Sequence, residues 1–160
     1  MLSCSAEVEI YASLDEVWSK LANFELYPNW SLCFASVTNV SSSSVSFVDS
    51  KLRFDFIRLK ERIRRVATIE EFSAPHCIVY SFTRPYAFWL KEIWHISLQT
   101  TESENTLVSM EVRYSGWTHV TTYQFEGPLI QSFCEAHLEA LKEELEKLGD
   151  VEDDDFFIEE

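Results

Sequence analysis

Glycine and proline are scarce in this sequence, with three glycines and four prolines among 160 residues. Collagen-like, low-complexity and wholly disordered chains are excluded by that composition. The four cysteines are far apart, form no CxxC pair and share no zinc-like spacing with histidine, so we expect neither a metal nor a cofactor. We also find no signal-peptide pattern and no run of about 20 apolar residues, which favours a cytoplasmic protein with reduced thiols.

Familiar catalytic signatures are missing as well. The sequence has no GxSxG, no HExxH, no phosphate-binding P-loop and no glycine pattern for dinucleotides. Common hydrolases, zinc proteases and NTPases are thereby excluded. Whether the protein is an enzyme stays open at this point.

Basic residues are few, with 13 lysines and arginines against 27 acidic residues. Seven of the acids follow Leu148, where no base occurs, so the rest of the chain is only moderately acidic. Because phosphate contacts require lysine and arginine, this balance argues against a nucleic-acid partner. We interpret residues 149–160 as an acidic tail that is disordered, and residues 1–148 as one domain.

Aromatic residues are abundant, at 14% of the chain, and apolar residues alternate along many short segments. The capping-box pattern Ser13 to Glu16 predicts a short helix, which Tyr27-Pro28 should end. A second apolar pattern at helical spacing predicts a long helix from Pro128 to Leu148, with Gly149 as its stop. Alternation and turn signals predict strands near residues 5–11, 35–40, 44–49, 51–59, 63–72, 78–82, 94–98 and 108–114.

This order, with strands preceding one long C-terminal helix, indicates an α+β fold rather than a doubly wound α/β fold. An amphipathic helix across an antiparallel sheet would cover the apolar face of the sheet. If the sheet is bowed, space remains beneath the helix.

Three segments resemble the START-like, or SRPBCC, superfamily, which includes the polyketide cyclase/dehydrase and lipid-transport group. They are the strand-helix stretch 6–18, the Phe24–Trp30 segment with its Tyr-Pro-Asn-Trp motif, and the strand pair around 94–114 that precedes the long helix. The resemblance implies a helix-grip (Bet v 1-like) fold of about six to seven strands with an internal hydrophobic cavity. Members bind lipids, sterols, quinones or polyketides, and some catalyse cyclisation or dehydration.

The cavity should be lined by one face of the strands and by the inner stripe of the last helix. Each of these side chains could instead simply fill the core. Three of them, Tyr80, Tyr114 and His137, are polar and are weak candidates for catalysis. The expected ligand-binding set is Phe54, Phe56, Tyr80, Phe82, Trp94, Ile96, Met110, Val112, Tyr114, Phe133, His137 and Leu141.

Two surface segments are candidates for transient membrane contact. Lys51–Arg65 holds seven basic residues against two acids, and Tyr86–Trp89 is an aromatic turn. Phe156-Phe157 within the acidic tail is a candidate for binding a protein partner. Three functions therefore stay open: a carrier of a hydrophobic small molecule, a polyketide cyclase or dehydratase using the same cavity, and a protein-interaction module.

Overall fold

Seven strands form one antiparallel sheet in the computed structural model of the protein, which describes residues 2–41, 48–84, 87–117 and 119–153. They lie side by side in the order β1-β7-β6-β5-β4-β3-β2. Their bounds are β1 (Leu2–Ile10), β2 (Phe34–Asn39), β3 (Lys51–Arg58), β4 (Glu61–Ser73), β5 (Cys77–Arg84), β6 (Ala87–Thr100) and β7 (Thr106–Gly116). The expected segment 44–49 is not among them: residues 42–47 lie outside the described residues, and Val48-Asp49 is a turn.

Three short helices join β1 to β2: α1 (Leu14–Ala22), η1 (Phe24–Leu26) and α2 (Tyr27–Trp30). The capping box is confirmed, because the Glu16 backbone N–H donates to the Ser13 hydroxyl and Glu16 accepts from the Ser13 backbone. The prediction that Tyr27-Pro28 ends this helix is wrong. Pro28 instead lies in the first turn of α2, where its missing N–H leaves no helical hydrogen bond unmade.

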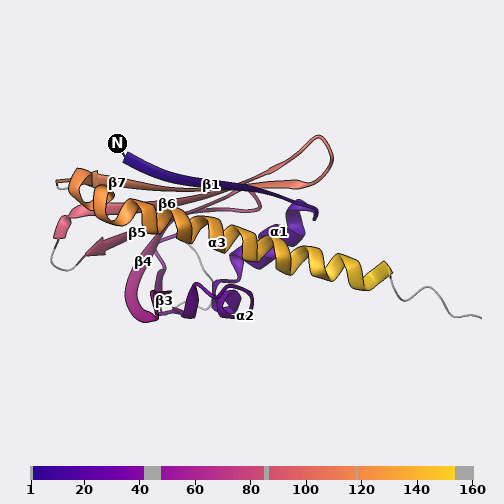
Figure 1. Cartoon of the computed structure of the whole chain (residues 1–160), viewed down its shortest axis with the longest axis horizontal. Coiled ribbons are helices and arrows are strands. Elements are labelled where there is room, and N and C mark those ends of the chain that lie inside the picture. Colours follow the sequence, from indigo (N-terminus) through magenta and orange to yellow (C-terminus); the bar gives the residue numbers. More distant parts are fainter. Residues whose placement is uncertain (1, 42–47, 85–86, 118, 154–160) are drawn as a thin grey trace, which may run out of the picture.

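The long helix α3 (His119–Asp153) crosses the inner face of the sheet (Figure 1). It begins nine residues before Pro128 and continues past Gly149, so both expected ends are wrong. Its first turns gain a tertiary contact from Tyr123, whose ring packs edge-on against Tyr114 of β7. Residues 154–160, with the Phe156-Phe157 pair, lie outside the described residues.

The core lies between the sheet and the helices and is strongly aromatic. Inward positions of β3, β5 and β6 bring Phe54, Tyr80 and Trp94 into one stack, with ring centroids 5.4 and 5.8 Å apart. Phe24 packs edge-on against this stack from η1. The α+β class and the helix-grip arrangement predicted from the sequence are therefore confirmed.

Candidate functional site

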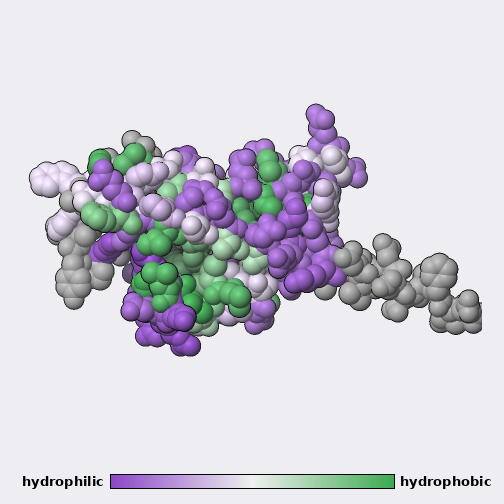
Figure 2. All heavy atoms as spheres, in the orientation of Figure 1, coloured by the Kyte–Doolittle hydropathy of each residue, from purple (hydrophilic) through white to green (hydrophobic). Residues whose placement is uncertain are grey.

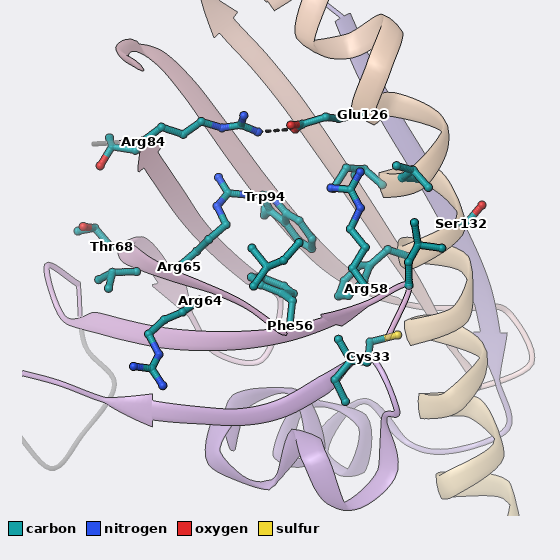
Figure 3. A pocket seen from close by; sticks show the side chains of 18 of the residues that line it. Cys33, Phe56, Arg58, Arg64, Arg65, Thr68, Arg84, Trp94, Glu126 and Ser132 are labelled. Carbon is teal, nitrogen blue, oxygen red and sulfur yellow. Dashed lines mark hydrogen bonds and ion pairs between the residues drawn. The ribbon is translucent and has the colours of Figure 1, made fainter. Parts of the chain in front are cut away.

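A hollow of about 1090 Å³ lies between the β3–β4 hairpin and the first half of α3 (Figure 3). Pockets that enclose small ligands typically measure roughly 300–1,000 Å³, so the size suits a ligand. In the space-filling view, apolar residues surround a hollowed area beside β3 and β4, below α3 (Figure 2). The space beneath the helix is therefore concentrated at one end of the sheet.

The hollow arises where the sheet splits. The ladder between β4 and β5 starts at Ala67 and Phe82 and runs toward Ser73 and Cys77. Residues 61–66 of β4 pair only with β3 among the described residues, and the end of β5 pairs only with β6. The hairpin can therefore diverge from the rest of the sheet and leave a gap beneath α3.

The walls of the hollow are mainly apolar. Phe56 and Ile63 face it from the hairpin, and Trp94 of β6 closes one side. On α3, Ile130 and Phe133 face the sheet three residues apart, the spacing that puts two side chains on one face of a helix. Strand alternation and helical periodicity together thus direct an apolar lining into the same space.

A network of charged groups lies beside these walls. Glu92, which is 1% exposed, accepts a bidentate pair from Arg65 at 3.1 and 3.0 Å and an indole N–H from Trp94 at 2.6 Å. Arg84 lies 3.8 Å from the same carboxylate and also pairs with Glu126 of α3. The network joins β4, β5, β6 and α3, and it balances two arginines against two glutamates.

Tyr114 lies close to this network but outside the hollow's lining. Its buried hydroxyl has no hydrogen-bond partner among the residues that the structure describes. Burial, reinforced by the nearby charges of Glu92 and Glu126, raises the pKa of Tyr114 well above its usual value. The phenol therefore stays protonated at neutral pH and has a hydroxyl available to donate.

Three of the twelve residues expected to line a cavity do line the hollow: Phe56, Trp94 and Phe133. The other nine are packed inside the core instead, where the ring of Phe54 on β3 stacks on that of Tyr80 on β5 and Tyr80 packs edge-on against Phe82. These nine are Phe54, Tyr80, Phe82, Ile96, Met110, Val112, Tyr114, His137 and Leu141.

His137 is buried under the middle of α3. Its Nδ1 lies 3.0 Å from the Ser31 hydroxyl, and its ring stacks on Trp30 with centroids 4.9 Å apart. Burial lowers the pKa of His137 to about 3, so the imidazole is neutral at physiological pH. Burial likewise raises the pKa of Tyr80. Both groups serve the packed core in this structure.

Glu92, Arg65 and Glu126 were missed by the sequence reasoning. Each could have been found by extending a pattern: Glu92 precedes Trp94 by two residues, and Arg65 follows Ile63 by two, so both share the inward face. Glu126 precedes Phe133 by seven residues, or about two helical turns. A search for apolar periodicity does not find these three residues, because their side chains are charged.

The two expected membrane-contact segments lie at different places. Within Lys51–Arg65, Arg58 and Arg65 contribute to the hollow, and Leu59, which borders it at the hairpin turn, is 81% exposed. Tyr86 lies outside the described residues, and Trp89 is 44% exposed. The basic segment is therefore partly the wall of the site and partly its outer rim.

Over the described ranges, no cluster of three or more histidine, cysteine or carboxylate side chains could hold a metal ion. Within the same ranges, every helix is too short or too polar to cross a membrane.

Solved structures with the same fold differ widely in sequence from this chain. A START superfamily protein from Mycobacterium smegmatis is 17% identical, with a TM-score of 0.68 over 91% of this chain and 98% of its own. A protein from Thermus thermophilus is 14% identical, with a TM-score of 0.72 over 92% and 99%. The di-domain ARO/CYC StfQ from the steffimycin biosynthetic pathway is 10% identical, with a TM-score of 0.73 over 92% of this chain and 51% of its own.

No curated protein matches the chain in sequence. Residues 1–146, however, match the family described as polyketide cyclase/dehydrase and lipid transport. That match spans the sheet, the short helices, the hollow and most of α3. The chain therefore belongs to the polyketide cyclase/dehydrase and lipid transport family.

Proposed function

We propose that this protein binds and carries a hydrophobic small molecule in the hollow between the β3–β4 hairpin and α3. The observation that carries the proposal is the hollow itself, whose apolar walls adjoin a fully packed core. An apolar ligand would be held by removal of its surface from water, worth about 25 cal/mol per Å² before the cost of association. A lipid, sterol, quinone or polyketide would suit these walls, and the family description names both lipid transport and polyketide chemistry.

The alternative function, a cyclase or dehydratase, needs a group that moves protons within reach of the ligand. None of the three candidates, His137, Tyr80 and Tyr114, belongs to the lining of the hollow. The carboxylate that does, Glu126, is paired with Arg84. The carrier function therefore has the stronger support.

Native mass spectrometry of the purified protein tests the proposal by looking for a co-purifying small molecule. Binding of Nile red, a neutral apolar dye, gives a second readout. Ile130→Trp, which places a bulky indole in the hollow beside Phe133, should weaken dye binding severalfold. Ile93→Trp adds the same indole on the outer face of β6 and should leave binding unchanged. Equal binding by both variants would contradict the proposal.

We propose further that the hairpin turn contacts an anionic membrane surface when ligand is exchanged. Leu59 and Lys60 have φ angles of 49° and 69°, which these residue types adopt only rarely. This turn holds Leu59 in solvent beside Lys60 and Arg62, a combination of apolar and cationic groups that suits anionic headgroups. Strained turns of this kind often mark functional sites.

Co-sedimentation with vesicles tests this contact. The protein should bind vesicles containing phosphatidylserine and bind pure phosphatidylcholine vesicles less. Leu59→Ser should reduce the bound fraction severalfold, whereas Tyr11→Ser, which removes another exposed side chain at the α1 end of the sheet, should not. Binding that is unaffected by Leu59→Ser would contradict the proposed contact.

A further inference from the structure

Four arginines line the hollow, and three of them already have acidic partners. Arg64 pairs with Asp55 at 2.7 Å, and Arg65 and Arg84 pair with Glu92 and Glu126 in the network described above. The side chain of the fourth, Arg58, makes no hydrogen bond or ion pair with any residue that the structure describes. Its guanidinium is therefore available to a ligand.

Arg58 is also placed to meet a ligand. It follows Phe56 by two residues at the end of β3, so it continues the inward face of the strand. Figure 3 shows its side chain directed into the space between the sheet and α3. Lys51, the other cation of the lining without an ion pair among the described residues, follows the opposite alternation and is exposed to water.

The surroundings strengthen the attraction of Arg58 for an anion. Trp94, Phe56 and Phe133 present apolar surface, and a charge next to such surface is less well screened than one in open water. A guanidinium can also donate two parallel hydrogen bonds to a carboxylate. The Glu92 network is internally balanced, and Arg58 lies outside it. Glu61, which lies opposite Arg58 across the hairpin, is exposed to water and forms no ion pair with it among the described residues, so Arg58 is the cation that a ligand anion would meet in this part of the hollow.

We infer that the ligand is an apolar molecule with one carboxylate, whose head group pairs with Arg58 while its apolar part lies along Phe56, Trp94 and Phe133. This inference rests on the proposed carrier function and narrows its ligand to acidic amphiphiles. A neutral molecule of the same shape leaves Arg58 without a partner, and a cationic one is repelled by it.

Competition against Nile red at pH 8 tests the inference with two isosteric probes, dodecanoic acid and dodecanamide, kept below micelle-forming concentrations. The acid should bind the native protein at least tenfold more tightly than the amide. Arg58→Gln should abolish this preference and change amide binding less than about twofold. Arg58→Lys should retain a smaller preference for the acid, because the positive charge remains but the pair of parallel hydrogen bonds from the guanidinium is lost. Arg62→Gln, on the exposed side of the same hairpin, should behave like the native protein.

Equal binding of acid and amide by the native protein would overturn the inference and leave the carrier proposal intact. A preference that survives Arg58→Gln would also overturn it. Failure of the native protein to bind Nile red and both probes would instead refute the carrier proposal. Because Arg58 has no partner among the described residues, we expect Arg58→Gln to melt at the native temperature.

Discussion

The two ends of α3 cover the same sheet in different ways. Its middle and second half lie on a closed core, where His137 packs against Phe34 and Leu141 is fully buried. Its first half lies over the hollow, where Ile130 and Phe133 meet a hairpin that has left the sheet. Both ends are rich in apolar side chains. The path of the β4 backbone therefore decides which end can hold a ligand.

Truncation at the closed end should have the largest effect. Phe54 is fully buried and packs against Phe34, Phe56 and Tyr80. Phe54→Ala should therefore lower the free energy of unfolding by about 3–5 kcal/mol. Ile130→Ala, at the partly exposed wall of the hollow, should lower the free energy of unfolding clearly less. Urea denaturation measures both. Equal losses would contradict the distinction between a closed and an open end.

Breaking the charge network should have the next largest effect. Glu92→Gln leaves Arg65 and Arg84 without this carboxylate while preserving an oxygen for the Trp94 indole. We expect a loss of about 2–3 kcal/mol in urea denaturation, less than for a fully buried pair because both arginines are partly solvated. Glu143→Gln, which removes an exposed helical pair, should change stability by roughly 0.5 kcal/mol or less.

Acidification should affect the closed end through His137. Its pKa in the folded protein is lowered to about 3, below the unfolded value near 6.5, so the unfolded chain binds the proton first. The contribution of neutral His137 to the free energy of unfolding is present above pH 6.5 and is lost progressively as the pH falls toward 3. Between pH 7.5 and 5.5 the native protein should lose about 1 kcal/mol from this group.

Denaturation at the two pH values, in the native protein and in His137→Gln, measures that loss. The variant should be less stable at neutral pH but should lose less on acidification. His76→Gln, which changes an exposed histidine, should show the native pH dependence. A pH dependence that is unchanged in His137→Gln would show that the imidazole is not the group responsible.

Replacing the hairpin turn should have the smallest effect, and one of opposite sign. Leu59→Asn with Lys60→Gly introduces residues that favour two successive positive φ angles, and should stabilise the protein by roughly 0.5–1 kcal/mol. Vesicle binding should fall in the same variant because the exposed leucine is gone. Thermal unfolding and co-sedimentation check the two effects. If the variant is more stable but binds vesicles as well as the native protein does, the strained turn with its exposed leucine is not the membrane contact.

Local patterns predicted much of the fold. The Ser13–Glu16 capping box and the alternation around Trp94 each depend on residues close together in the sequence. The ends of α3 could not be predicted in this way. Pro128 and Gly149 favour helix ends locally, but packing of Tyr123 against Tyr114 supports a longer helix.

The candidate site was harder to predict for a related reason. Alternation correctly placed Phe54, Tyr80 and Trp94 on the inner face, but it could not show that their rings fill the space between them. The position of the hollow depends on where β4 stops pairing with β5, which is a property of sheet register. Arg65 was assigned to a basic outer surface because its partner, Glu92, is 27 residues away.

The split in the sheet also leaves part of a strand edge without a neighbouring strand. Residues 61–66 of β4 have one side hydrogen-bonded to β3 and, among the described residues, no strand on the other. An unpaired strand side of this kind can recruit a strand from a second molecule and start aggregation. Here Arg62, Arg64 and Arg65 occupy that stretch, and charged side chains on a strand edge are one of the means by which proteins block such pairing. The arginines therefore oppose edge-to-edge pairing along the stretch where β4 has left β5.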